Sequence, residues 1–150
     1  MKNQILAIIA LLSLLTATAH SGNFTVSPIK VEIERGMDTA ILKFKNISAK
    51  PLTLQVSIKG WSIEEDGTNT YTNTGDLIFF PKIFTMEENE EASLRIAYKG
   101  KPPEEIEKAY RIFAAEIPNK LKQTGVTMRL TLSVPLFIKP EKQKQKYSQF

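Results

Sequence analysis

Two clusters of glutamate residues carry the side chains in this sequence whose type and spacing best suit acid/base chemistry. The first cluster comprises Glu87, Glu88, Glu90 and Glu91, and the second comprises Glu104, Glu105 and Glu107. Two carboxylates act as general acid and base only when burial or a close partner raises the pKa of one of them. Both clusters lie in polar, turn-like segments, and we therefore predict a solvated surface rather than a catalytic pair.

The other reactive side chains exclude the common catalytic and metal-binding classes. The single histidine, His20, lies near the amino terminus, where no rigid element positions it, and the chain has no cysteine. The sequence contains no glycine-rich phosphate loop and no Gly-x-Ser-x-Gly elbow. We therefore expect a protein that is not an enzyme and that binds no metal and no other cofactor.

The charge of the chain gives no argument for a nucleic-acid partner. The formal net charge is +4, and much of the excess lies in the carboxyl-terminal stretch KPEKQKQKYSQF. A nucleic-acid surface would show basic residues interleaved with aromatic ones, and we find no such patch. We expect residues 141–150 to form a polar, solvated tail.

The first nineteen residues have the organisation of a secretory signal peptide. Lys2 supplies a basic start, residues 5–15 are almost wholly apolar, and Ala17-Thr18-Ala19 fits the small-x-small pattern of signal peptidase cleavage. The apolar run is shorter than the roughly 20 residues that a membrane-spanning helix needs. The sequence thus predicts an exported chain without an integral membrane span and one domain over residues 20–140.

Period-two alternation of apolar residues predicts β-strands along the whole domain. Seven candidate strands follow one another at short, regular spacing without a long helical pattern, an internal repeat or a linker. They lie within residues 24–34, 39–48, 51–61, 76–84, 92–100, 109–118 and 126–140. This pattern is typical of an antiparallel β-sandwich.

Three details of these strands are testable predictions. Ile29, Val31 and Ile33 should share one face of the first strand. Pro81 removes a backbone donor, so its strand should bend there or lie at a sheet edge. Trp61 should be a large core residue rather than a platform for a ligand.

The last candidate strand has an unusually long apolar face. Apolar residues occupy every second position from Val126 to Ile138. From alternation alone, these side chains could line the domain's own core, as we expect for Val134, Leu136 and Ile138. The same side chains could instead be offered to a partner.

The sequence resembles the amino-terminal domain of the PapD-like periplasmic chaperones that assemble pili in the chaperone/usher pathway. The resemblance rests on six stretches in order, from VSPIKVEIERG through TLQVSIKGWSIEEDG, DLIFFPKIFTME, ASLRIAY and AYRIFAAEIP to VPLFIKP. It implies an immunoglobulin-like, seven-stranded sandwich and a chaperone that works without ATP. The implied partners are pilin or fimbrial subunits that lack their last strand, together with an outer-membrane usher.

The resemblance also implies site residues. The family lends alternating apolar residues of its last strand to the subunit, a form of β-strand addition, and the matching positions here are Val126, Met128, Leu130 and, as a possible fourth, Leu132. Two basic residues of the family hold the subunit's terminal carboxylate. Lys30 matches the first, Pro135 stands at the second, and we consider Arg111 as its substitute. Both basic residues could instead be outward-facing strand charges.

The resemblance leaves alternatives open. The family continues into a second immunoglobulin-like domain, whereas this chain continues for ten polar residues after Pro140. A truncated gene, a sufficient single domain and a separate second chain all fit that pattern. Rival functions are a secreted structural or adhesion component of a pilus, a non-functional remnant and, least favoured, an enzyme of unrecognised type.

Overall fold

The computed structural model describes residues 23–34, 37–117 and 129–140, and these residues form an all-β domain. Their strands are β1 (Phe24–Ser27), β2 (Val31–Ile33), β3 (Thr39–Asn46), β4 (Leu52–Ile63), β5 (Asn69–Asn73), β6 (Leu77–Phe80), β7 (Ile83–Met86), β8 (Glu91–Tyr98), β9 (Lys108–Ile117) and β10 (Thr131–Ile138). The described residues contain no helix, and so none that could cross a membrane. The expected signal peptide and tail lie outside the described residues.

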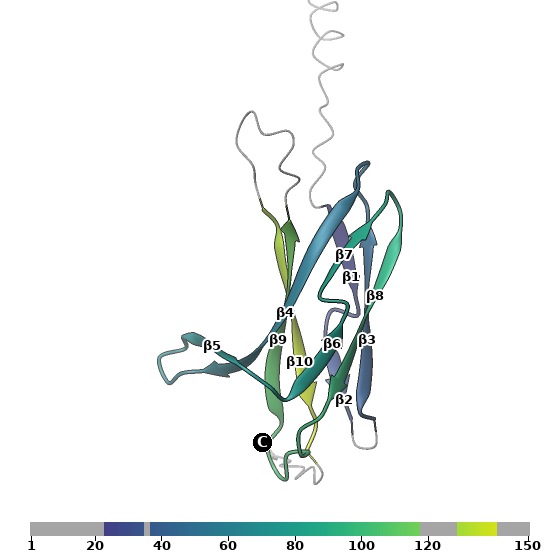
Figure 1. Ribbon diagram of the computed structural model, residues 1–150. Coiled ribbons are helices and arrows are strands. Elements are labelled where there is room, and N and C mark those ends of the chain that lie inside the picture. The colour runs from purple at the N-terminus through teal and green to yellow at the C-terminus, as the bar shows by residue number, and fades with distance from the viewer. Residues whose placement is uncertain (1–22, 35–36, 118–128, 141–150) are drawn as a thin grey trace, which may run out of the picture.

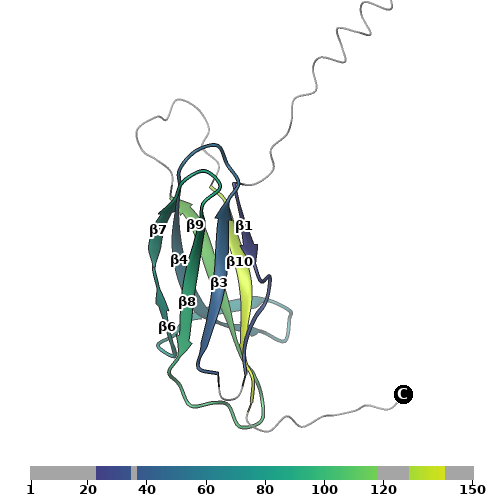
Figure 2. The same ribbon diagram turned by 90° about the vertical axis from the view of Figure 1, so that its right-hand side faces the viewer.

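Two sheets pack face to face as a sandwich (Figures 1 and 2). One sheet has the order β1-β3-β8-β6, and the other has the order β2-β10-β9-β4-β5 with β7 paired to β4. All strand pairs are antiparallel except β10 with β2, which is parallel. The immunoglobulin-like sandwich expected from the sequence is therefore confirmed.

The seven candidate strands account for nine of the ten strands in the described residues. Two candidates are each divided by a proline at which the chain moves from one sheet to the other: β1 leads to β2 through Pro28, and β6 leads to β7 through Pro81. The bend expected at Pro81 is confirmed. The prediction for Ile29 is wrong, because its side chain is 81% exposed in the turn between β1 and β2, whereas Val31 and Ile33 are buried.

The sequence prediction missed β5, which pairs with the far end of β4. Figure 1 shows this hairpin projecting sideways from the body of the sandwich. The burial pattern explains the miss, because four of its five residues are exposed and carry no alternating apolar signal.

The core lies between the sheets and is built by alternate residues of each strand. The inward set of β4 comprises Leu52, Leu54, Val56 and Ile58, all of them buried. β3 contributes Leu42 and Phe44, and β8 contributes Leu94 and Ile96. The period-two pattern of the sequence is the cause of this arrangement, because successive side chains of a strand point to opposite faces.

Polar interactions close the two ends of the sandwich. Asn46 is fully buried, and its amide nitrogen lies within hydrogen-bond distance of three backbone carbonyls, those of Lys50, Met86 and Glu87. At the other end, the hydroxyl of Tyr110 donates to Asp76 Oδ2 at 2.7 Å. This bond, together with nearby Lys108, lowers the pKa of the Asp76 carboxyl.

Candidate functional site

The outer edge of β10 is open along the first part of the strand. β9 pairs with β10 over its whole length, from Thr131 to Ile138. On the opposite edge, β2 pairs with β10 only from Leu136 to Ile138. Residues 131–135 therefore present an edge without a strand partner in the described part of the chain.

The register between β10 and β9 shows which backbone groups face this open edge. The backbone N–H of Glu116 donates to the carbonyl of Leu130 at 3.0 Å, so Leu130 directs its backbone groups toward β9. The direction of the backbone N–H and C=O groups alternates from residue to residue along an antiparallel ladder, so the backbone groups of Leu132 and Val134 also point toward β9. The backbone groups of Thr131, Ser133 and Pro135 consequently face outward, and those of the first two residues provide both donors and acceptors.

The described side chains of the expected donor strand, those of Leu130 and Leu132, lie on the core side of the sheet. Leu130 and Leu132 are partly buried against the hydrophobic core, next to the buried Val134. They are less enclosed than the other end of the strand, where Leu136 and Ile138 are buried. Val126 and Met128, which the sequence also assigns to the donor strand, lie outside the described residues.

The two expected carboxylate-binding residues lie on either side of Pro135. Arg111 of β9 is the register partner of Pro135. Lys30 directly precedes β2, whose first residue Val31 is the register partner of Leu136, so Lys30 lies beside Pro135 on the other side. Neighbouring strands are about 4.8 Å apart, which separates the Cα atoms of Lys30 and Arg111 by about 10 Å. Both residues belong to the outward-facing alternation of their segments.

The guanidinium of Arg111 lies over the aromatic ring of Trp61. Its central carbon is 4.1 Å from the centroid of the Trp61 ring, and one terminal nitrogen donates to Ser133 Oγ at 3.2 Å. The Nε atom is buried and has no hydrogen-bond partner. Arginine carries five N–H donors, so most of those on Arg111 are not used by the residues that the structure describes.

Lys30 is engaged in a network of exposed charges. Its ammonium lies 3.1 Å from Glu32 Oε1, and the same oxygen is 2.9 Å from the ammonium of Lys139, which also pairs with Glu107. The hydrogen bond from Lys139, followed by that from Lys30, lowers the pKa of the Glu32 carboxyl. Exposed ion pairs contribute only about 0–1 kcal/mol, so another carboxylate can compete with Glu32 for Lys30 at little cost.

The structure corrects the prediction for Trp61. Its side chain is partly exposed on the outer face of the sheet, where it packs against Arg111 and contacts Phe137 at a centroid distance of 6.2 Å. The alternation along β4 could have predicted this position. Leu54, Val56 and Ile58 point inward, so the odd-numbered residues of the strand, Trp61 among them, point outward. Ser133 and Glu32 are further residues of this face that the sequence analysis did not single out.

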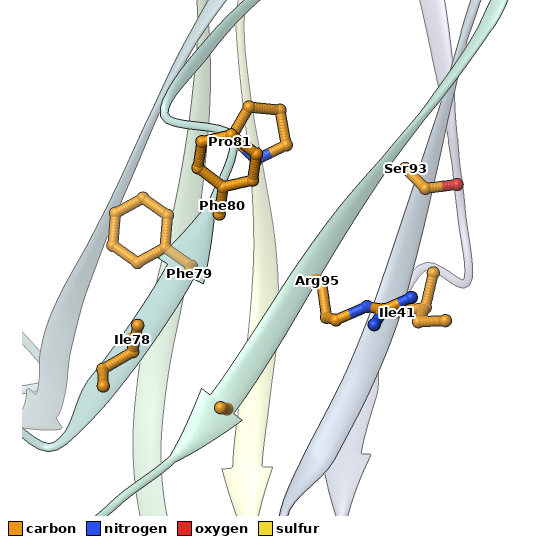
Figure 3. Close-up of a pocket in the computed structure, with 8 residues that line it drawn as sticks. Ile41, Ile78, Phe79, Phe80, Pro81, Ser93 and Arg95 are labelled. Carbon is orange, nitrogen blue, oxygen red and sulfur yellow. The ribbon is translucent and has the colours of Figure 1, made fainter.

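Other parts of the described surface offer less for chemistry. All seven glutamates of the two clusters are exposed, as predicted, and the described residues contain no group of side chains that could hold a metal ion. The opposite sheet carries a shallow hollow of about 530 Å³, in which Arg95 lies between Phe80 and Ile41 (Figure 3). This hollow is on the outer face of the four-stranded sheet, away from the open edge of β10.

Comparison with known proteins identifies the class of protein that this fold and edge define. Residues 23–144 match the family described as pili and flagellar-assembly chaperone, PapD N-terminal domain. The chain therefore belongs to this chaperone family. No curated protein matches it by sequence.

Solved structures with the same fold include chaperones from several bacteria. The chaperone–tip adhesion subunit complex CsuC–CsuE of Acinetobacter baumannii matches with a TM-score of 0.69 and 19% identity over 80% of this chain and 58% of that chain. The complex of the SafA pilin with the SafB chaperone of Salmonella enterica matches with a TM-score of 0.65 and 19% identity over 83% and 57%. The CupB2 chaperone of Pseudomonas aeruginosa matches with a TM-score of 0.60 and 21% identity over 77% and 55%. The chain thus spans little more than half the length of these chains.

Proposed function

We propose that this protein is a periplasmic chaperone for pilin-type subunits, which it stabilises by lending the open edge and apolar side chains of β10 to a subunit that lacks its last strand. The observation that carries the proposal is the open outer edge from Thr131 to Pro135, in a chain of the pilus-assembly chaperone family. Export through the predicted signal peptide would bring the chain to the compartment in which such subunits fold. Delivery to an outer-membrane usher and independence of ATP belong to the same proposal.

The physical basis of the proposal is mutual protection of two exposed edges. An incomplete subunit exposes its core and unpaired backbone groups, and such an edge is prone to aggregation. β10 supplies N–H and C=O groups for the backbone and apolar side chains for the groove. Burial of each apolar side chain contributes about 1.5–3 kcal/mol before the ordering cost of association is subtracted.

The side chains divide into two roles in this proposal. Val126, Met128, Leu130 and Leu132 enter the subunit's groove, the last two from positions that the domain's own core only partly covers. Lys30 and Arg111 hold the subunit's terminal carboxylate beside Pro135. The partial exposure of Lys30 and the unused donors of Arg111 support that second role.

The test is co-expression of the chain in the periplasm with a strand-deficient pilin subunit, followed by co-purification. We expect a one-to-one complex with the unaltered chain and its loss in the double variant Met128→Arg and Leu130→Arg. The variant should remain folded, because Leu130 is only partly buried.

The matched control is Ile106→Arg, which charges a side chain that is 79% exposed and lies in the loop before β9. This variant should bind the subunit like the unaltered chain. Retention of the complex in the double variant would contradict the proposed role of β10, as would a homopolymer of the chain that excludes the subunit.

A further inference from the structure

Pro135 occupies the point at which the outer edge of β10 passes from a paired to an open state. The pairing with β2 begins at Leu136, one residue later. Pro135 is opposite Arg111, and ladder alternation from the bond between Glu116 and Leu130 directs its backbone away from β9. The nitrogen of Pro135 therefore faces the outer edge, but proline has no N–H to donate there.

The missing donor stops the parallel ladder between β10 and β2. The backbone N–H of Lys139 donates to the carbonyl of Ile33 at 3.0 Å, which sets the phase of this ladder. The bonding residues of a parallel pair recur every two positions on each strand. Two steps toward the amino end, the next bond would require an N–H at position 135 and the carbonyl of Ile29. Ile29 instead lies in the turn between β1 and β2, outside the paired residues.

We infer that Pro135 is a boundary residue: it ends the pairing between β10 and β2, so that the edge of β10 before it stays open to an added strand. At position 135 itself, the end of the added strand can be bound only by side chains. The first half of this inference concerns the chain without a partner. The second half rests on the proposed function. An added strand pairs with the edge groups of Thr131 and Ser133, and its end lies beside Pro135.

The donors around Pro135 determine which chemical group can bind at the end of the added strand. No backbone donor is present at position 135, and the cations next to it on the two neighbouring segments are Lys30 and Arg111. A free terminal carboxylate is satisfied by these two cations through charge-assisted hydrogen bonds. An amidated or extended terminus offers no carboxylate to these cations, which then keep only their contacts with Glu32, Trp61 and Ser133. Binding at Pro135 should therefore depend on a free carboxylate.

Amide hydrogen exchange of the partner-free chain tests the first half. The amides of Thr131 and Ser133 should exchange at least tenfold faster than those of Leu132 and Val134, which bond to β9. In Pro135→Ala, the new amide at position 135 should be protected at least tenfold relative to that of Thr131, because it can bond to the carbonyl of Ile29. An unprotected amide at position 135 would show that proline is not what ends the ladder.

Disulfide crosslinking with a strand-deficient pilin subunit tests the second half. The chain has no cysteine, so Ser133→Cys introduces a single thiol, and a disulfide forms only between Cα atoms about 4.4–6.8 Å apart. Single cysteines placed along the subunit's pairing strand should give one dominant crosslink. Pro135→Ala should move that crosslink by two residues or lower its yield at least fivefold. An unchanged pattern would overturn the inference.

Two controls separate this inference from the proposed function. Pro51→Ala replaces an exposed proline ahead of β4 and should leave exchange and crosslinking unchanged. Addition of two residues to the subunit's carboxyl terminus should lower binding to the unaltered chain at least tenfold, and unaltered binding would contradict the carboxylate requirement. Failure of every variant to bind the subunit contradicts the proposed function, whereas the exchange of the partner-free chain still decides the boundary role of Pro135.

Discussion

The geometry of Arg111 depends on properties that a lysine does not share. Its planar guanidinium covers the Trp61 ring at 4.1 Å and reaches Ser133, so it is pre-positioned beside Pro135 before any partner binds. A lysine keeps the charge but has neither the flat face nor the rigid fork that binds a carboxylate through two hydrogen bonds. The residue type at position 111 therefore matters more than its charge.

Replacement of Arg111 by lysine should weaken subunit binding about tenfold, as measured by titration with a strand-deficient subunit. The stability of the partner-free chain should fall by at most about 1 kcal/mol, because exposed cation–π contacts contribute about 0.5–1 kcal/mol. Arg95→Lys on the opposite sheet is the matched control and should bind normally. Equal affinities for the two variants would contradict the role of Arg111.

The sequence located these residues only in part. The resemblance singled out Lys30 and Arg111. It gave no distance between them, because their relative position depends on the register of β2, β10 and β9. Trp61 was assigned to the core on residue type, although strand parity places it outside. Residue type is a weaker guide than alternation wherever an aromatic side chain can pack against an arginine on an outer face.

At the scale of the strand, alternation gives neighbouring residues of β10 opposite roles. The backbone of Leu132 faces β9, and that of Ser133 faces the open edge. A proline is tolerated in a strand only where the lost donor faces outward. Proline substitution therefore distinguishes the paired edge from the open one.

Leu132→Pro should lose about 1–3 kcal/mol of the free energy of unfolding, because it leaves a backbone acceptor of β9 without its donor, whereas Ser133→Pro should lose less than about 1 kcal/mol. Ser133→Pro should nevertheless fail to bind the subunit, because it removes an edge donor. Leu132→Ala and Ser133→Ala are the controls, because they remove the same side chains but keep the backbone N–H. Stability is measured by urea unfolding, and subunit binding by titration. Comparable destabilisation by the two prolines would show that the outer edge of β10 is not open.

The strands themselves were largely predictable, and their connections were not. Alternation found β3, β4, β8, β9 and β10, because each has one buried face. Segments without a regular apolar alternation were harder to predict. β5 has no buried face, and β2 follows a turn in which Ile29 lies outside the core. The order of strands within each sheet depends on long-range pairing, which no local pattern specifies.

At the scale of the whole molecule, the described residues combine a continuous hydrophobic core with a sheet edge that has no strand partner among them. The core is continuous between the two sheets, and the chain maintains it without a disulfide. Soluble β-proteins usually cover or charge their edges to avoid pairing with other chains. In the proposed function, this open edge beside two cations is the subunit-binding site, a role consistent with the chaperone family to which the chain belongs.

Amide hydrogen exchange of the purified complex with a strand-deficient pilin subunit tests the central claim most directly. The account predicts that the amides of Thr131 and Ser133 become at least tenfold more protected than in the partner-free chain. The amides of Leu132 and Val134, which already bond to β9, should change little. A stable complex in which Thr131 and Ser133 still exchange at their partner-free rates would contradict strand donation by β10.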